Sequence, residues 1–438
     1  FRATHPLFTI IQQKRTGEFI RTLLRQYKEG GQLPIWELAA NYTGCMIGYH
    51  AIPVIVDAYA KGITDFDVDL ALKAMIHSAK QDDLGLKYYK ENGFISASDE
   101  PESVSKTLEY AYDDWCIALL ADSLGNEKIA TTFYQRGQYY KNLFDPSTGF
   151  FRAKKSHTWF APFRPEEVNF NYTEANAWQY SLFVPQDISG HIKLMGGAKN
   201  YEQHLDNMFS ASTETSGREQ PDVTGLIGQY AHGNEPSHHM AYLYNYVGKP
   251  HKTQKIVRKI LDEQYTHLPD GLSGNEDCGQ MSAWYVLSAM GFYSVTPGLD
   301  YYTIGTPIFE KATLNLENGN TFCITAKNVS DNNIYIQSSS LNGEEFNQSF
   351  IGHQTIMNGG ALVFEMGSKP SDWGHKSIPP AEIKENKIVP VPFFEAASQT
   401  FVDEMTIELG SAVGGNIYYS LNGTKEKKYD EPITITKD

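Results

Sequence analysis

"HKTQKIVRKILDEQYTHLPDGLSGNEDCGQMSAWYVLSAMGFY", residues 251–293, contains two predicted helices of different character joined by a polar loop. The first, over 251–265, is charged on one face, as a helix at the surface of a protein should be. The second, over 281–293, is apolar nearly all round, as a helix in an inner layer should be. Between them lie Gly, Pro, Asn and Asp, the residue types that punctuate helices with loops. The stretch therefore predicts a hairpin that pairs an outer helix with an inner one.

The same helical periodicity dominates residues 5–300. Predicted helices lie within 6–30, 46–62, 66–80, 102–125, 127–144, 173–184, 201–209, 237–248, 251–265 and 279–293. Several end at a glycine, as helices commonly do: Gly30, Gly62, Gly125, Gly248 and Gly291. Few strand signals lie between the helices, which excludes a βαβ layout. Paired outer and inner helices predict a toroid of helical hairpins, in which the ends of the inner helices surround a pocket.

The pattern changes after Pro297. Residues 321–328, 333–346 and 359–367 alternate in hydropathy, with Asn-Gly and Gly-Gly turns among them, which predicts antiparallel hairpins over 301–368. A connector with Pro, Ser and Gly then leads to a third segment, 388–438, whose strands around an Asn-Gly turn predict part of a small β-sandwich. We therefore expect a mainly α protein, with a helical domain over 1–300 followed by small antiparallel β segments.

Composition excludes several kinds of partner. The chain has 438 residues and a net charge of −15, whereas nucleic acid and anionic membranes require a basic face. No apolar run is long enough for a membrane-spanning segment. The four cysteines are far apart and show no zinc-binding spacing. The acidic balance suits a neutral substrate or a bound cation. Because residues 1–10 enter a periodic segment at once, we expect the chain to begin within a longer protein.

Four stretches gather polar and aromatic residues where a loop meets a helix: 33–46, 171–180, 232–246 and 274–285. Each contributes carboxylates: Glu37, Glu174, Glu235, and Glu276 with Asp277. If the inner helices ring a pocket, these loops converge at its mouth. Carboxylates, amides, His and Trp without a nucleophilic Ser/His/Asp pattern suit cleavage of a glycosidic bond. That reaction needs one carboxylic acid to protonate the leaving oxygen and one carboxylate to activate water or attack.

Structural interpretations remain open for each stretch. Glu174 could simply occupy a first helical turn, and His238 and His239 could be packed core groups. Asp113 and Asp114 lie mid-helix, where buried acceptors of hydrogen bonds from neighbouring loops are the simpler account. The tryptophans Trp36, Trp178 and Trp284 could be plain core residues. Asn234 and Glu235 offer hard oxygen ligands of the kind that calcium prefers, although no EF-hand loop is present.

The longest motifs resemble a known family. "MIGYHAIPVIVDAYAKG", "VSKTLEYAYDDWCIA", "YTEANAWQY", "GNEPSHHMAYLYNYVGKPHKTQ" and "GNEDCGQMSAWYVLSAMGFY" are similar, in the expected order, to the bacterial α-mannosidases of glycoside hydrolase family 92. The resemblance covers roughly residues 1–368. It implies an exo-acting, calcium-dependent, inverting α-mannosidase with an (α/α)6 catalytic barrel and an N-terminal β-sandwich domain. The tail from about 388 resembles the small β-sandwich appended to some hexosaminidases.

The resemblance also implies residue roles. Glu174 would be the general acid and Asp277 the general base, about 6.5–9.5 Å apart in an inverting enzyme. Asn234 and Glu235 would hold Ca²⁺ against two sugar hydroxyls. Further residues of the four loops are expected to contact substrate: Trp36, Glu37, Trp178, Gln179, His238, His239, Asn275, Glu276 and Gln280. We expect neighbouring donors to keep Asp277 ionised near neutral pH and a drier position to keep Glu174 protonated.

This sequence departs from the pattern of the family in two ways. Asn275 stands where some members of the family carry an acidic residue, and the β-sandwich domain and an acidic residue that precede "FRATHP" in the family are not in this chain. The expected substrates are mannose-containing glycans, such as N-glycan or yeast-mannan branches, with α-1,2 linkages as the expected preference. The expected location is extracellular or periplasmic in a bacterium.

Two alternative functions remain. One is a non-catalytic carbohydrate-binding protein, against which the presence of both Glu174 and Asp277 counts. The other is a different (α/α)6 sugar-active enzyme, such as a lyase or phosphorylase. A phosphorylase needs a basic phosphate pocket, and the motif loops contain almost no Lys or Arg. Dependence on calcium would separate the mannosidase from these other enzymes.

Overall fold

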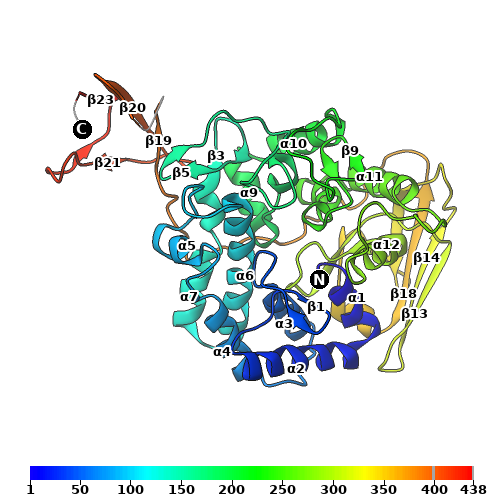
Figure 1. Cartoon of the computed structure of the whole chain (residues 1–438). Helices are drawn as coiled ribbons and strands as arrows, with labels where there is room; N and C mark the ends of the chain where they lie inside the picture. The colour runs from blue at the N-terminus through cyan, green and yellow to red at the C-terminus, as the bar shows by residue number, and fades with distance from the viewer. Residues whose placement is uncertain (397–399, 437–438) are drawn as a thin grey trace.

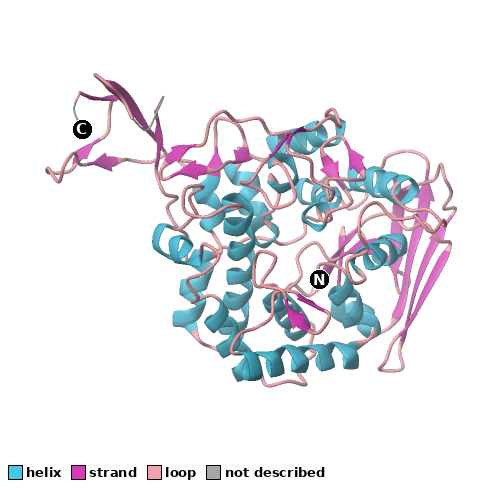
Figure 2. Ribbon diagram, in the orientation of Figure 1, coloured by secondary structure: helices cyan, strands magenta, loops and turns pink. Residues whose placement is uncertain are grey.

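The computed structural model describes residues 1–396 and 400–436. Helices occupy most of the first 290 residues, and strands dominate the rest (Figures 1 and 2). The α-helices are α1 (Thr4–Ile11), α2 (Gln13–Gly30), α3 (Ala51–Ala60), α4 (Val68–Ser78), α5 (Leu86–Asn92), α6 (Ser103–Ser123), α7 (Glu127–Arg136), α8 (Ala177–Tyr180), α9 (Ile188–Leu194), α10 (Ala198–Ser210), α11 (Pro250–Glu263), α12 (Gln280–Met290) and α13 (His353–Met357). Figure 1 shows the helices of the first 290 residues placed around a central region that contains the N-terminus.

The predicted difference between outer and inner helices is confirmed for the pair α11 and α12. On α11, Val257 and Ile260 are buried while Lys255 and Lys259 are exposed. On α12, Trp284 and most of its neighbours are buried. A helix with one charged face can lie only at the surface, whereas an apolar one is stable only inside.

Helix α6 is an inner helix with most of its residues buried, and it carries charged residues inside the protein. Asp114 accepts hydrogen bonds from Tyr49 (2.6 Å), Tyr89 (3.0 Å) and Arg136 Nε (2.7 Å). Burial nevertheless raises the pKa of Asp114 to about 6. The prediction that Asp113 and Asp114 are buried hydrogen-bond acceptors is therefore confirmed.

Several predicted helices differ from the structure. The helix expected over 6–30 is divided at Gln12, which leaves the helical region (φ −146°). Only Ala177–Tyr180 of the helix expected over 173–184 is α-helical, because Asn176 caps it late. The segment expected over 237–248 forms 3-10 turns, η3 (Glu235–Ser237) and η4 (Met240–Val247). Further 3-10 turns are η1 (Tyr139–Leu143) and η2 (Pro185–Asp187), and helices α5 and α9 were not predicted.

Short two-residue strands connect the helices: β1 (Glu37–Leu38), β2 (Asn41–Tyr42), β3 (Phe144–Asp145), β4 (Phe150–Phe151), β5 (Lys154–Lys155), β6 (Thr158–Trp159), β7 (Glu167–Val168), β8 (Ser216–Gly217), β9 (Leu226–Ile227) and β10 (Tyr230–Ala231). The β-rich part contains β11 (Phe292–Tyr293), β12 (Tyr301–Ile304), β13 (Lys311–Asn315), β14 (Thr321–Lys327), β15 (Tyr335–Leu341), β16 (Glu344–Glu345), β17 (Phe350–Gly352) and β18 (Gly360–Gly367).

The sheet that follows the helical part is mixed, in order β13-β14-β18-β15-β16. Strands β14 and β18 run parallel, so the expectation of purely antiparallel segments is wrong for this pair. A parallel neighbour needs a long crossover, and β15 to β17 with α13 supply it. Buried residues from both parts, including Tyr242, Trp284, Phe322 and Phe364, form one core. Residues 301–368 therefore pack as one unit with the helices.

The tail contains β19 (Phe393–Glu395), β20 (Met405–Gly410), β21 (Tyr418–Tyr419), β22 (Lys427–Lys428) and β23 (Ile433–Ile435). Strand β19 pairs in parallel with β6, which extends the β5–β6 hairpin into the sheet β23-β20-β19-β6-β5. Phe393 packs on Trp159 with ring centroids 4.9 Å apart. The connector is also packed, since Trp373 and Ile383 are buried. Across the described residues, each helix is too short or too polar to span a membrane.

A half-buried histidine makes the stability of this fold depend on pH. His50 lies 2.8 Å from Asp113 and 3.2 Å from Glu109. Burial alone would lower the pKa of His50, but the two carboxylates raise it to about 9. A raised pKa stabilises the folded state fully below the unfolded value of about 6.5, and this contribution disappears as pH rises through about 9.

We therefore expect His50→Gln to lower the free energy of unfolding by on the order of 3 kcal/mol at pH 6 and by much less at pH 9.5. Urea unfolding at both values measures the difference. His77→Gln, which removes an exposed histidine from α4, is the control. An equal loss at both pH values would show that packing, not charge, accounts for the role of His50.

Candidate active site

Three of the four motif loops meet in the structure. Asn234 Nδ2 donates to the main-chain oxygen of Glu174 (3.1 Å) and to its carboxyl Oε2 (3.3 Å). The Asp277 carboxyl group lies close enough to that of Glu235 for the two negative charges to raise the pKa of Asp277. The loops that begin at Asn171, His232 and Gly274 therefore lie together through polar side chains, as predicted for three of the four.

Two glycines allow the loops 232–246 and 274–285 to approach closely. A Cβ added to Gly233 would lie 1.9 Å from Thr224 Oγ1. A Cβ added to Gly274, which has φ +86°, would lie 2.6 Å from the carbonyl oxygen of Gly233. Only glycine fits such contacts and such a backbone. The glycine before each Asn-Glu pair therefore has a packing role that brings the carboxylates together.

Glu174 lies in a tight turn just before α8. Its φ is +50°, a conformation that few residues other than glycine adopt, and such strain clusters at functional sites. Asn176 closes the turn with a capping box in which Gln179 is the partner. Burial is the main cause that raises the pKa of Glu174 to about 7, and Asp222 adds to it. This carboxyl group can hold a proton near neutral pH, as expected of a general acid.

Asp277 is also in a left-handed conformation, with φ +53°. Its side chain reaches solvent, yet partial burial and the nearby Glu235 raise its pKa to about 6. The expected influence of neighbouring donors is not what governs this pKa, because burial and the charge of Glu235 raise it instead of lowering it. Asp277 is still ionised for the most part at pH 7, as a base must be.

The other acidic residue of this loop has a structural role. Glu276 accepts hydrogen bonds from the main-chain N–H groups of Gly279 (2.5 Å) and Ser282 (3.2 Å) at the start of α12. Negative charge at these free N–H groups stabilises a helix. Asn275 is exposed and donates to Asp222 Oδ1 (3.4 Å). Glu276 and Asn275 therefore hold the loop that presents Asp277.

Asp222 was not predicted from the sequence. Its charge raises the pKa values of both Glu174 and Asp277, so it lies close to both. Gln220 donates to its second oxygen (2.5 Å). Asp222 belongs to a polar loop, "REQPDVTG" (218–225), and a carboxylate between Pro and Gly is an ordinary loop residue.

His238 is buried beneath these loops and is neutral. Its Nε2 donates to the main-chain oxygen of His232 (2.8 Å), so Nδ1 accepts from Gln280 Nε2 (2.9 Å). Burial lowers the pKa of His238 to about 4. Gln280 also accepts from the main-chain N–H of Ala3 (2.7 Å), which ties the start of α12 to α1.

The side chains of His239 and Gln179 also form hydrogen bonds within the protein. His239 bonds through Nε2 to the oxygen of Leu182 (3.0 Å), and burial lowers its pKa to about 4. Gln179 donates to the oxygen of Gln229 (2.7 Å). Trp178 packs edge-on against Phe150, with ring centroids 4.7 Å apart. These contacts position the site, and direct contact of these side chains with substrate stays a prediction.

Trp36 and Glu37 lie apart from the other motif loops. They are exposed and belong to the start of the β1–β2 hairpin, where Gln26 donates to Glu37. Among the described contacts, none joins this hairpin to Glu174, Glu235 or Asp277. Convergence of the first loop on the pocket stays a prediction.

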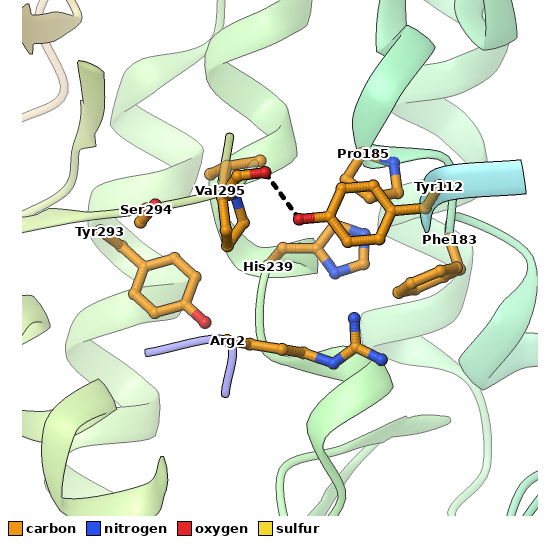
Figure 3. Close-up of a pocket in the computed structure, with 9 residues that line it drawn as sticks. Arg2, Tyr112, Phe183, Pro185, His239, Tyr293, Ser294 and Val295 are labelled. Carbon is orange, nitrogen blue, oxygen red and sulfur yellow. Dashed lines mark hydrogen bonds between the residues drawn. The ribbon is translucent and has the colours of Figure 1, made fainter. Parts of the chain in front are cut away.

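A small cavity of about 10 Å³ lies beside the site (Figure 3). Arg2, Tyr112, Phe183, His239 and Tyr293 line it, and the Arg2 guanidinium lies 4.7 Å from the Phe183 ring centre. The volume is about that of one water molecule, so this cavity is too small for a sugar.

The residues at the loop junction suit a hard cation in part. Asn234, Glu235, Asp277 and Asp222 offer only oxygen donors, which is the chemistry that calcium prefers. Within residues 1–396 and 400–436, however, no group of three or more His, Cys, Asp or Glu is placed to hold a metal ion. A cation at Asn234 and Glu235 would therefore need main-chain carbonyls and water to complete its shell.

Comparisons with known proteins agree with this geometry. The model of the glycosyl hydrolase family 92 catalytic domain matches residues 1–368. The structure of a family GH92 α-mannosidase from Bacteroides thetaiotaomicron, in complex with mannoimidazole, is similar with a TM-score of 0.84 and 38% identity, covering 88% of this chain and 53% of that chain. A family GH92 inverting mannosidase from B. thetaiotaomicron VPI-5482 is similar with a TM-score of 0.79 and 38% identity, covering 87% and 54%.

An uncharacterized secreted glycosidase from Arthroderma benhamiae is 30% identical over 405 residues, which are 82% of this chain and 50% of that protein. The chain therefore spans about half the length of the relatives it matches. Paired carboxyl groups on a helical scaffold with these similarities define a glycoside hydrolase catalytic domain. The chain belongs to glycosyl hydrolase family 92, which confirms the resemblance read from its motifs.

Proposed function

We propose that the protein is an exo-acting α-mannosidase that removes terminal α-linked mannose, with a preference for α-1,2 linkages, from glycans. The observation that carries the proposal is the pair of carboxyl groups in strained turns, Glu174 with a pKa of about 7 and Asp277 with a pKa of about 6. One group is suited to give a proton and the other to take one near neutral pH. The similar structures are named as mannosidases, which supports mannose as the sugar.

The reaction proceeds with inversion. Glu174 protonates the glycosidic oxygen as the bond to the leaving group breaks, and Asp277 removes a proton from the water that attacks the opposite face of the sugar. Each carboxyl group ends in the opposite protonation state and exchanges protons with solvent before the next turnover. Asn234 holds Glu174 in place through its two hydrogen bonds.

Calcium at Asn234 and Glu235 would supply Lewis-acid charge that orients two neighbouring hydroxyl groups of the sugar. Those two residues are fixed for such a role, since Asn234 Oδ1 accepts from the Glu235 N–H (3.0 Å) and Asn234 is buried. The excess of carboxylates over cationic side chains around them also favours a bound cation.

We propose that the helical part of this enzyme is an (α/α)6 barrel. In this proposal the complete protein includes an N-terminal β-sandwich domain that contributes to the pocket. We infer a location outside the cytoplasm, since a related glycosidase is named as secreted. Mannose-containing glycans at a cell surface or in the medium would be its substrates.

Mannose release from α-1,2-mannobiose by the full-length protein tests the proposal. We expect activity with Ca²⁺ and a fall of at least about tenfold after chelation with EDTA, restored by added Ca²⁺. Activity that is unchanged by EDTA would contradict the role of calcium. Absence of release from α-1,2-, α-1,3-, α-1,4- and α-1,6-linked mannosides would contradict the mannosidase assignment itself.

A further inference from the structure

A second cavity, of about 420 Å³, lies beside the turn that carries Glu174. The loop before α6 forms one wall, with Ser98 and Asp99, and residues 169–171 form another. Phe160 of the segment after β6 also lines it. Its volume falls in the range of small-ligand pockets, and none of the roles given above to the motif residues uses it.

The two walls are held in place by main-chain hydrogen bonds. The N–H of Glu102 donates to the oxygen of Phe170 (2.6 Å), and the N–H of Val104 donates to the oxygen of Asn171 (3.1 Å). On the other side, the N–H of Ala97 donates to the oxygen of Lys154 (2.8 Å). The cavity is therefore preformed rather than a gap between loose loops.

The lining suits an uncharged, polar ligand with flat apolar faces. Phe170 is 67% exposed, which is unusual for so large an apolar side chain, and Arg218 covers only one side of its ring at 4.6 Å. Asn169 and Asn171 add amide groups to the lining. Pyranose rings present apolar C–H faces to aromatic rings and hydroxyl groups to amides.

Charge compensation in the lining favours a neutral ligand. Lys106 pairs with Glu100 (2.5 Å), and Arg164 pairs with Glu167 (3.1 Å). Because the carboxylates of Glu100 and Glu167 are already paired with Lys106 and Arg164, they do not favour binding of a cationic ligand. Asp99 adds a negative charge to the lining and the Arg218 guanidinium, over the Phe170 ring, adds a positive charge beside it, so neither a cation nor an anion is favoured.

The cavity lies close to Glu174, the proposed general acid. Asn171 in its wall precedes Glu174 by three residues, so their Cα atoms are at most about 11 Å apart. Glu102, which is bonded to Phe170, also contributes to the raised pKa of Glu174. Glu174 protonates the leaving oxygen in the proposed mechanism, so the rest of the glycan departs past this residue.

We propose that this cavity binds the second and third sugar units on the leaving-group side of the same mannose-containing glycan, with Phe170 as the stacking platform. This proposal rests on the proposed function and names the part of the substrate that the cavity selects. Longer glycans then gain binding energy that a disaccharide, with a single leaving-group unit beside Glu174, does not reach.

The test compares kcat/KM for α-1,2-mannobiose and α-1,2-mannotetraose in the full-length protein and in Phe170→Ala. We expect kcat/KM on the tetraose to fall about tenfold while that on the biose changes less than about twofold. The ratio of the two values is independent of the folded fraction, because both substrates meet the same enzyme. Phe309→Ala, which removes another exposed phenylalanine (49% exposed) at the start of β13, is the matched control and should leave the ratio unchanged.

An equal fall on both substrates, or no fall on either, overturns the proposal. If the wild-type protein releases no mannose from any linkage, the proposed function fails. Calorimetric titration of mannotetraose into the wild type and into Phe170→Ala then tests separately whether the cavity binds a glycan. Binding that is weakened about tenfold by Phe170→Ala then supports the cavity as a glycan site, and equal binding overturns it.

Discussion

Asp277→Asn is expected to lower kcat for mannoside hydrolysis about a thousandfold without unfolding the protein. An amide cannot take the proton of the attacking water. The fold should tolerate the change, because asparagine accepts the left-handed backbone of this position (φ +53°) better than most residues. The amide also removes the repulsion between the carboxyl groups of Asp277 and Glu235. Initial rates of mannose release by the full-length protein, together with its thermal unfolding midpoint, measure both effects.

Glu276→Gln is the matched control for this prediction. It neutralises the adjacent carboxylate in the same loop, which caps α12. We expect a loss of about 0.5–2 kcal/mol in stability and a change in kcat of less than about fivefold. A control variant that loses as much activity as Asp277→Asn would contradict the assignment of the base. Asp277→Asn with near wild-type activity would contradict it as well.

The sequence predicted the helices best where one signal governed the whole element. Apolar periodicity located α11, α12 and α6, and the buried acceptor role of Asp113 and Asp114 followed from their position within α6. It failed where a local contact overrode the pattern. Asn176 delays the start of α8 with its capping box, and the apolar segment after His239 winds as a 3-10 turn. Helix propensity is added up over a window of residues, so it cannot detect the effect of one such contact.

The site was predictable only in part for a similar reason. Adjacent residues such as Asn234 and Glu235, or Glu276 and Asp277, are visible as motifs. The distribution of roles within a motif is not, since it depends on where each side chain points: Glu276 turns to the helix N–H groups, whereas Asp277 meets Glu235. Asp222 reaches the same place from a loop that has no motif. The parallel pairing of β14 with β18 likewise depends on a long connection whose path the hydropathy pattern does not encode.

Lys61→Met is expected to lower the free energy of unfolding by about 3–5 kcal/mol. Lys61 directly follows α3, its side chain is fully buried, and Nζ lies 2.8 Å from Asp57, which is also buried. Asp57 in turn accepts from the N–H of Gly298 (2.8 Å), and Lys61 Nζ lies 4.7 Å from the ring centre of Tyr302. This ion pair therefore joins the helical part to the first strands of the β-rich part. Removal of the ammonium group leaves a buried carboxylate without its counter-ion.

The double variant Lys61→Met with Asp57→Asn separates the cost of the orphaned charge from the loss of packing. We expect it to recover at least half of the lost stability in urea unfolding, because the amide needs no counter-ion and still accepts from Gly298. Lys252→Met is the control at the surface: Lys252 pairs with Glu202 (2.7 Å) and Asp206 (2.6 Å) but is partly exposed, so we expect a loss of at most about 1 kcal/mol. A Lys61→Met variant no less stable than Lys252→Met would contradict this expectation, because the buried pair would then contribute no more to stability than a pair at the surface. The helical part and the β-rich part would then be held together by their shared apolar core alone.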